Sequence, residues 1–409
     1  MATAAPFKKG RAPDLVTAAS NPAAGLMPAL NWAGVKTDAH VIVGGGAKTT
    51  DNETVNRAMR LRATATADED TDTYVDAVVA YSEDGTALNR ATLTDLSDSR
   101  EFMEVAPIMN CVMFAGGQDE KGYSRVVEMY DSFGGHRILT PLSSARTDMA
   151  SAALGENILF AGGDDGSGAS DVIECYTINF TKRMIGLSLP LAVKGLCGCS
   201  FGNYAVFAGG RDENGLPTDK VIAVDRNMNI ISNIEPLSSP RYNLAAAVCT
   251  NPEDETESYL LIAGGKSTHS GFSTVVDVYD SSLNKVNAGL ELTVGRSRLK
   301  GASCQGYALF AGGVVGVEPA DTPSNIVDVF NYKLKRFEPM TLSEARNSLS
   351  AASFSDKVLF AGGYSLNGVS KVVDTFTFNS GGDDPEPEYA TVTYHWPSAL
   401  VQYFYGNEN

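Results

Sequence analysis

Apolar and polar residues alternate along most of the chain in short runs, and a pair of glycines ends many of these runs. Alternation with a period of two is typical of β-strands that have one buried face. The segment Val275-Val276-Asp277-Val278-Tyr279-Asp280 shows it clearly. Turn-forming pairs such as Asn367-Gly368 separate the runs and favour hairpins. The pattern therefore predicts an all-β protein.

The apolar run with its two glycines repeats six times between residues 111 and 363, at intervals of 46, 47, 55, 48 and 50 residues. The pairs are Gly116-Gly117, Gly162-Gly163, Gly209-Gly210, Gly264-Gly265, Gly312-Gly313 and Gly362-Gly363. A weaker seventh copy, Val41-Ile42-Val43-Gly44-Gly45, lies upstream. A period near 50 residues with paired glycines is typical of a β-propeller. We expect about seven four-stranded blades.

These units resemble the kelch-repeat family of β-propellers, whose units carry a paired glycine, then Tyr-Asp, then a tryptophan. The resemblance covers about residues 28 to 380, with Tyr-Asp at 130–131 and 279–280. Where the family has its tryptophan, this chain has residues such as Ile138, Val286 and Phe337. The resemblance implies the architecture and leaves the activity open. The loose repeats and the Ala/Thr-rich start are closer to microbial or bacteriophage proteins than to animal ones.

Three segments are expected: an amino-terminal segment 1–27, a propeller 28–379 with an insertion at about 47–73, and a tail 380–409. Two segments could supply the outer strand that closes the ring, residues 12–20 or residues 388–396. We favour the first, because the acidic, proline-bearing stretch 380–388 is typical of a linker. The tail is then left to pack on the propeller or to dock on a partner through its aromatic residues. These are Tyr389, Tyr394, Trp396, Tyr403, Phe404 and Tyr405.

A column of basic residues precedes the innermost strand of each repeat. Its members are Arg100, Arg146, Lys194, Arg241, Arg296 and Arg346. They are expected to ring one mouth of the central channel. One hypothesis pairs each base with an acid of the third strand, drawn from Asp76, Glu128, Glu174, Asp277, Asp328 and Asp374. The other leaves some bases unpaired at the mouth, where they bind an acidic peptide or an anionic sugar.

Composition narrows the classes of function. The net charge of −17 opposes binding to nucleic acid, and no apolar stretch is long enough for a membrane helix. The six cysteines fall mostly inside predicted strands and are expected to be buried thiols, and the first residues lack the layout of a secretory signal. The four histidines occupy different places in their repeats, so we expect no metal, no cofactor and no catalytic residue.

The sequence therefore predicts a non-catalytic propeller that binds proteins as a module of a larger assembly. We expect a protein of the cytoplasm or of a virion, with a bacteriophage virion or tail as one possible assembly. The alternative is a carbohydrate-binding surface protein or a sugar-modifying propeller enzyme. It would use the basic column with Tyr123, Phe272 and Tyr364 as a platform.

Overall fold

The computed structural model describes residues 5–11, 23–27, 30–32, 35–37, 40–44, 78–84, 87–92, 95–98 and 100–378, with short gaps at 109–110, 120, 132–134, 269–270, 317–321, 355 and 371. The chain divides into a unit Met1–Phe378 and a second unit Asn379–Asn409. The second unit, with the aromatic tail, lies outside the described residues, as does the insertion at 47–73. Every described element is a strand, and the described part contains no helix that could span a membrane.

Six four-stranded blades carry the glycine-pair repeats, and each is named here after its innermost strand. The β8 blade contains β8 (Glu104–Ile108), β9 (Cys111–Ala115), β12 (Val127–Asp131) and β13 (His136–Ile138). The β14 blade contains β14 (Ala150–Leu154), β15 (Asn157–Ala161), β16 (Ser170–Thr177) and β17 (Lys182–Arg183), and β18 (Ser188–Val193) also pairs with β16. The β19 blade contains β19 (Cys197–Phe201), β20 (Tyr204–Ala208), β21 (Val221–Asp225) and β22 (Ile230–Ile231).

The other three blades have the same order. The β23 blade contains β23 (Ala245–Thr250), β24 (Ser258–Ala263), β27 (Val276–Asp280) and β28 (Lys285–Val286). The β29 blade contains β29 (Lys300–Cys304), β30 (Tyr307–Ala311), β33 (Ile326–Asn331) and β34 (Met340–Thr341). The β35 blade contains β35 (Ser350–Phe354), β36 (Lys357–Ala361), β39 (Val373–Phe378) and β1 (Phe7–Arg11).

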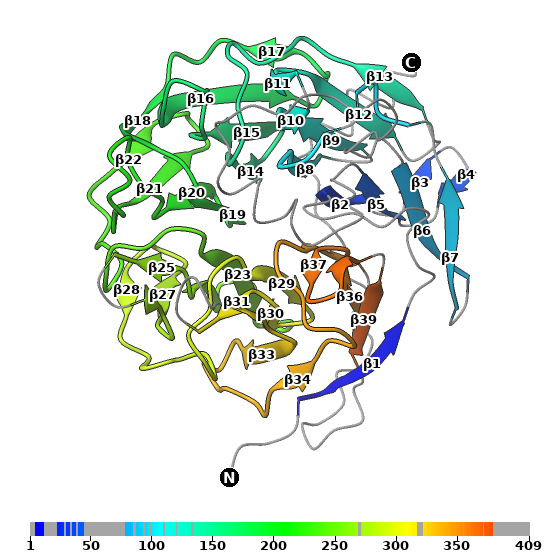
Figure 1. Ribbon diagram of the computed structural model, residues 1–409, viewed down its shortest axis with the longest axis vertical. Coiled ribbons are helices and arrows are strands. Elements are labelled where there is room, and N and C mark those ends of the chain that lie inside the picture. Colours follow the sequence, from blue (N-terminus) through cyan, green and yellow to red (C-terminus); the bar gives the residue numbers. More distant parts are fainter. Residues whose placement is uncertain are drawn as a thin grey trace, which may run out of the picture. The chain divides into compact units, whose positions relative to one another are not determined.

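A further four-stranded sheet contains β2 (Ala23–Met27), β5 (His40–Gly44), β6 (Val78–Asp84) and β7 (Ala87–Thr92). Its innermost strand β2 contacts both β8 and β35, so the sheet stands in the ring between their blades (Figure 1). The expected all-β propeller is confirmed. About seven blades were expected, and six are described with their side chains. The side chains of the β2 sheet are outside the described part of the structure.

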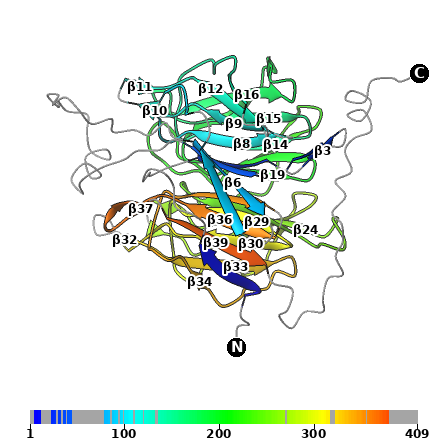
Figure 2. The same cartoon turned by 90° about the vertical axis from the view of Figure 1, so that its right-hand side faces the viewer.

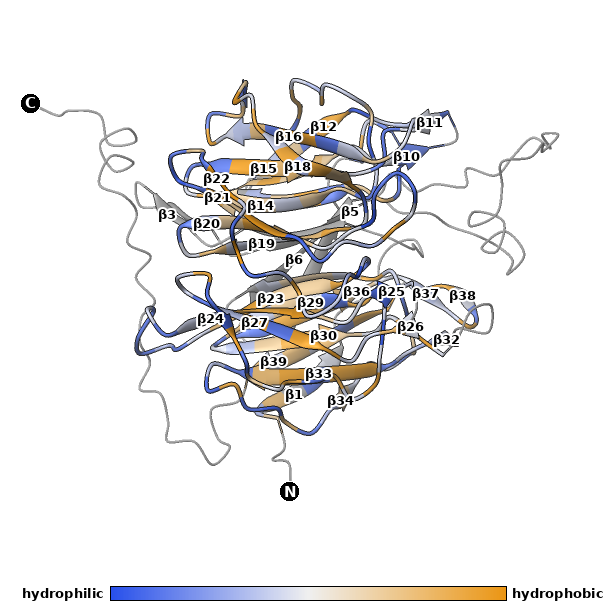
Figure 3. Ribbon diagram, turned by 90° about the vertical axis from the view of Figure 1, so that its left-hand side faces the viewer, coloured by the Kyte–Doolittle hydropathy of each residue, from blue (hydrophilic) through white to orange (hydrophobic). Residues whose placement is uncertain are grey.

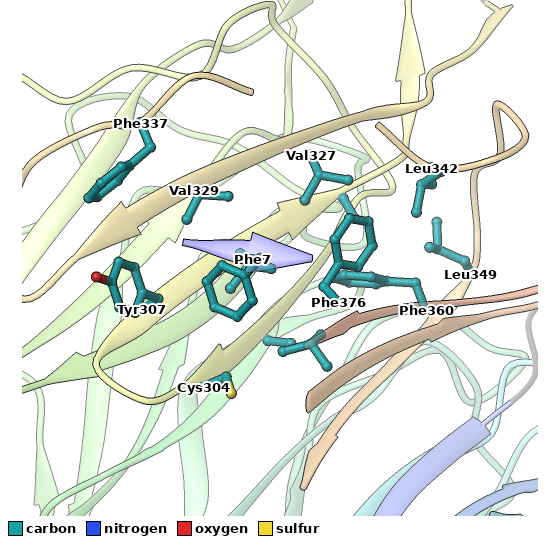
Figure 4. Close-up of a cluster of buried hydrophobic side chains, with 14 residues drawn as sticks. Phe7, Cys304, Tyr307, Val327, Val329, Phe337, Leu342, Leu349, Phe360 and Phe376 are labelled. Atoms are coloured by element: carbon teal, nitrogen blue, oxygen red, sulfur yellow. The ribbon is translucent and has the colours of Figure 1, made fainter. Parts of the chain in front are cut away.

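The outer strand of the β35 blade comes from the amino-terminal segment. Strand β1 pairs antiparallel with β39, with Phe7 opposite Phe378 and Arg11 opposite Asp374. Phe7 makes edge contacts with Tyr307 and Phe378, with ring centroids 5.4 and 5.8 Å apart. Figure 4 shows Phe7 in the hydrophobic cluster shared by the β29 and β35 blades. Residues 12–20, which we expected to form this strand, lie outside the described residues.

Short hairpins connect second to third strands, and Figures 2 and 3 show them on one side of the ring. They are β10–β11 (Gln118–Asp119, Gly122–Tyr123), β25–β26 (Lys266–Ser267, Gly271–Phe272), β31–β32 (Val314–Val315, Thr322–Pro323) and β37–β38 (Tyr364–Ser365, Gly368–Val369). We call this side the hairpin face. One more hairpin, β3–β4 (Leu30–Trp32, Val35–Thr37), belongs to the amino-terminal part.

The paired glycines allow adjacent blades to approach closely. Gly162 and Gly163 have φ values of +68° and +103°, in the left-handed region that favours glycine. A Cβ atom at Gly162 would lie 2.7 Å from the carbonyl oxygen of Val193, and one at Gly163 would lie 2.5 Å from that of Thr147. The glycines therefore have an architectural role.

The register corrects one position that the resemblance suggested. Arg137 is opposite Met129 and Val286 is opposite Val278, at the same place in their blades, so the counterpart of Val286 is Arg137 and not Ile138. Ile138 is one residue further along, and 61% of it is exposed. Phe337 is buried as expected and fills space between blades.

Candidate functional site

The arginine column does not ring the mouth of the channel. Five of its members are buried with no exposed surface: Arg100, Arg146, Arg241, Arg296 and Arg346. Each forms an ion pair with the third-strand acid of its own blade, so the pairing hypothesis describes them correctly. The N–O distance is 2.6 Å for Arg346 and Asp374 and 3.5 Å for Arg146 and Glu174. Asp76, the acid expected in the β2 sheet, lies outside the described residues.

Four of these arginines, Arg146, Arg241, Arg296 and Arg346, also link two neighbouring blades. The backbone N–H of Arg146 donates to Ser124 of the β8 blade, and its carbonyl accepts from Gly117 of that blade. Its guanidinium enters the β14 blade, where Nη1 donates to the carbonyls of Gly162 (2.7 Å) and Val172 (3.0 Å). The side chain therefore points between strands and not into the channel. This is why the expectation of a cationic mouth built from these arginines is wrong.

Each third-strand acid that pairs with one of these arginines also accepts hydrogen bonds from other donors. The carboxylate of Glu174 accepts from the backbone N–H (2.6 Å) and hydroxyl (2.5 Å) of Ser143, and Lys182 binds its other oxygen at 2.6 Å. Burial alone would raise the pKa of Glu174, but the hydrogen bonds from Lys182 and Ser143 bring it below its ordinary value. Burial lowers the pKa of Arg146, and the negative charge of Glu174 opposes this decrease. The result is a buried quartet of hydroxyl, arginine, acid and outer-strand base.

The sequence carries a signal for this quartet that goes beyond the basic column. A Leu-Ser/Thr-x-x-Arg motif precedes five of the innermost strands, at residues 96–100, 142–146, 237–241, 292–296 and 342–346. In each motif the Ser or Thr donates its backbone N–H to the buried acid of the third strand. The outer-strand bases that bind the acids are His136, Lys182, Lys285 and Arg336.

Lys194 is not a member of the column. Its backbone pairs with Arg211, as Thr147, the residue after Arg146, pairs with Asp164. Val193 therefore occupies the arginine position of the β19 blade. Its carbonyl accepts a hydrogen bond from the N–H of Gly163, just as the carbonyl of Arg146 accepts one from the N–H of Gly117. Lys194 lies at the rim, 19% exposed at its side chain, and forms an ion pair with Asp164. It is the one residue of the six that the structure places at the channel mouth.

A ring of left-handed residues forms that mouth. Two positions after each column position stand Phe102, Asp148, Gly195, Asn243, Arg298 and Ser348, with φ values between 51° and 66°. From Asp148 to Ser348, hydrogen bonds join the backbones of consecutive members. Gly195 N–H donates to the Asp148 carbonyl (3.1 Å), and the same bond links Asn243 to Gly195, Arg298 to Asn243 and Ser348 to Arg298. Each of these six blades thus places one residue at a fixed position on the rim, and all of them except Gly195 carry a side chain there.

The rim combines both signs of charge. Burial raises the pKa of Asp148, an effect that Arg211, Arg298 and Lys194 oppose and Asp164 reinforces. The guanidinium of Arg211 lies over the ring of Tyr242, 4.9 Å from its centroid. Deeper in the channel, Glu104 accepts a 2.7 Å hydrogen bond from Ser151, and burial raises its pKa. The mouth can therefore bind polar or charged groups of a ligand.

Exposed apolar side chains surround this mouth on the hairpin face. Tyr123, Leu216 and Leu366 are 37%, 56% and 66% exposed. All three lie in connections between second and third strands, the segments that form the hairpin face (Figure 3). Phe272 and Tyr364 belong to the same connections and are half-buried. The face thus has charged groups at its centre and apolar groups farther out.

The cysteines behave as expected of buried thiols. Five of the six are buried, and Cys199 is half-buried. Burial raises the pKa of Cys111 and Cys249 to about 12. They have a packing role in the blades.

Comparison with known proteins supports the fold alone. No family model matches the chain, and no curated protein matches it. Among solved structures, the chain is similar to the protein of "Structure of YjhT", with a TM-score of 0.54 and 12% identity over 91% of this chain and 98% of the other. Because 519 solved chains match, the likeness identifies a common architecture and no activity. The kelch-repeat family remains a resemblance based on the repeated residues.

Proposed function

We propose that this chain is a non-catalytic binding propeller that contacts a protein partner with its hairpin face. The observation that carries the proposal is the arrangement of that face, where Tyr123, Leu216 and Leu366 project around a rim of fixed charges. Interfaces commonly combine apolar contact residues with polar groups that set orientation. A propeller fold fits a binding or interaction module.

Affinity capture from the native source tests the proposal. The wild-type chain is compared with a Leu216→Asp/Leu366→Asp variant, and bound proteins are identified by mass spectrometry. We expect the variant to lose its specific partner, because two carboxylates would be desolvated in the interface. The matched control is Asn227→Asp, an exposed residue in a connection between third and fourth strands. Equal capture by the Leu216→Asp/Leu366→Asp variant and the wild type would refute the hairpin face as the binding surface.

A second candidate function is carbohydrate binding on the same face. Tyr123, Phe272 and Tyr364 lie in the hairpin strands β11, β26 and β37, and aromatic rings of this kind can stack on sugars. A glycan array on the full chain, repeated with Tyr123→Ala, tests this function. Signals that disappear in the variant would favour it, and an array without signals would remove it.

The assembly to which the chain belongs is a separate proposal. We propose, from the sequence, a place in a bacteriophage virion or tail, and no described residue bears on it. Detection of the chain in purified virions by mass spectrometry would support this assignment. Its absence from virions, with the chain present in the infected cell, would contradict it.

A further inference from the structure

The outer strands of the β8 and β14 blades differ from those of the next three blades. In the β19, β23 and β29 blades one outer-strand residue packs in the hydrophobic clusters between blades, and the next is polar and exposed. The packed residues are Ile231, Val286 and Phe337. The polar residues that follow them are Ser232, Asn287 and Glu338.

In the β8 and β14 blades this order is reversed. Arg137 is opposite Met129 and Arg183 is opposite Cys175, so arginines occupy the packed position, and both are exposed. The residues that follow are apolar: Ile138 is 61% exposed and Met184 is 86% exposed. Because side chains on a strand alternate between faces, a shift of the pattern by one residue turns Ile138 of β13 outward, and Met184 follows directly after β17. The same reversal therefore occurs in two consecutive blades.

The two reversed strands belong to neighbouring blades that are bonded at their outer edges. Lys182 Nζ donates to the carbonyl of Pro141 (3.0 Å), and the hydroxyl of Tyr176 donates to the carbonyl of Thr140 (2.7 Å). These bonds hold the segment after β13 against the β14 blade. Figure 1 shows β13 and β17 at the rim of the ring. We call Arg137, Ile138, Arg183 and Met184 the arginine–aliphatic edge.

A single exposed apolar side chain needs no explanation. Here two large ones occur at equivalent positions, each next to an exposed arginine, on a chain whose net charge is −17. Arginine and methionine are enriched at protein interfaces, and guanidinium groups select carboxylates. Charge complementarity therefore favours an acidic partner.

We propose that the arginine–aliphatic edge is a second docking surface, and that its occupant is an acidic segment of another protein that also carries aliphatic side chains. The aliphatic groups cover Ile138 and Met184, and the carboxylates bind Arg137 and Arg183. This surface is on the outer strands and shares no residue with the hairpin face. Variants of the two surfaces therefore test the two proposals independently.

The probe is a labelled peptide of alternating Glu and Leu, with Lys–Leu and Glu–Ser peptides as controls, titrated against the full chain by fluorescence anisotropy. We expect the Glu–Leu peptide to bind, and added salt to weaken binding. Arg137→Glu/Arg183→Glu and Ile138→Ser/Met184→Ser should each lower the affinity by at least about tenfold. Arg226→Glu, at an exposed arginine of the β19 blade, should bind the peptide as the wild type does. Thermal melts confirm that each variant folds.

Three results would overturn the proposal. The first is equal affinity of the edge variants and the wild type, or no binding of the Glu–Leu peptide. The second is equal binding of the Lys–Leu peptide, which would remove the charge selectivity. The third is a concentration-dependent dimer in sedimentation velocity that the edge variants abolish, because the occupant would then be a second copy of this chain.

Discussion

The β14 and β19 blades have the same four-stranded order but fill the space beneath the paired glycines in opposite ways. The β14 blade uses the charged quartet Ser143, Arg146, Glu174 and Lys182. At the equivalent positions the β19 blade has only apolar residues or proline: Pro190, Val193, Ile222 and Ile230. The register supports this equivalence, since Glu174 pairs with Phe160 as Ile222 pairs with Phe207.

The comparison shows that the charged quartet is one of two solutions to the same packing problem. All four residues differ together, so no buried charge is left without its partner in the β19 blade. Val193 and Ile222 instead join a hydrophobic cluster with residues of the β14 blade. A buried ion pair can be replaced by apolar residues of similar volume at little cost, whereas removal of one partner is costly. The following predictions test this interpretation.

The largest effect is expected from a single break in the quartet. Arg146→Ala leaves the Glu174 carboxylate buried with one base fewer and removes two hydrogen bonds to backbone carbonyls. We expect a loss of about 3–5 kcal/mol in the free energy of unfolding. Urea unfolding followed by far-ultraviolet circular dichroism measures this free energy. The control is Arg226→Ala at an exposed site, for which we expect a change within about 0.5 kcal/mol.

A smaller effect is expected when the three charged members of the quartet are all converted to apolar residues. Arg146→Val/Glu174→Ile/Lys182→Ile gives the β14 blade the residues of the β19 blade at these three positions and keeps Ser143. We expect this triple variant to lose about 1–2 kcal/mol, less than Arg146→Ala alone, because no charge remains unpaired. The same urea titration compares the two. A triple variant that loses the sum of its single-variant losses would contradict the interpretation.

The pH dependence of these variants has a defined sign. The pKa of Glu174 in the folded chain lies below its ordinary value of 4.5, so this group stabilises the fold above pH 4.5. That stabilisation is lost as the pH falls through the folded-state pKa. The stability difference between the wild type and the triple variant should therefore narrow below about pH 4.5, in chemical unfolding at several pH values. A difference that stays constant down to pH 3 would show that Glu174 does not contribute in this way.

The smallest effect is expected at the channel mouth, where the pKa of the acid is shifted upward and not downward. Burial raises the pKa of Asp148, so its carboxylate destabilises the fold above the ordinary value of 3.8. Asp148→Asn should raise the stability at pH 7 by roughly 1 kcal/mol, and the gain should vanish as the pH falls below 3.8. Asparagine tolerates the left-handed backbone, as Asn243 shows at the equivalent position. A loss of stability at pH 7 would mean that Arg211 and Lys194 outweigh the burial of Asp148.

Several features of the fold follow from the sequence with little ambiguity. The paired glycines and the alternating strands are local patterns, and their regular spacing leads directly to the propeller. The match between repeated bases and repeated acids also leads to the ion pairs seen at Arg296 and Arg346. Lys194 was placed in the column because it is basic, although Val193 is the residue that stands 16 positions before its glycine pair at Gly209, as Arg146 stands before Gly162.

The residues of the candidate site could not be predicted from the sequence in the same way. The left-handed residues at the mouth have unrelated side chains, such as Phe102, Asp148 and Arg298, so no motif marks them. They share a backbone position that is defined by hydrogen bonds between consecutive blades. The exposure of Ile138 could not be predicted either, because an apolar residue in a strand is expected to be buried.

The sequence by itself determined the all-β propeller and suggested the pairing of charges as one of two hypotheses, because both depend on residues at short, repeated spacings. The tertiary structure alone decided that the guanidinium groups lie between blades and that other side chains occupy the mouth. Alternation along a strand specifies which residues share a face, but not which neighbour covers that face. The neighbour is another blade, some 50 residues away in the sequence. Only its packing decides whether a charged side chain is buried in an ion pair or offered to a partner.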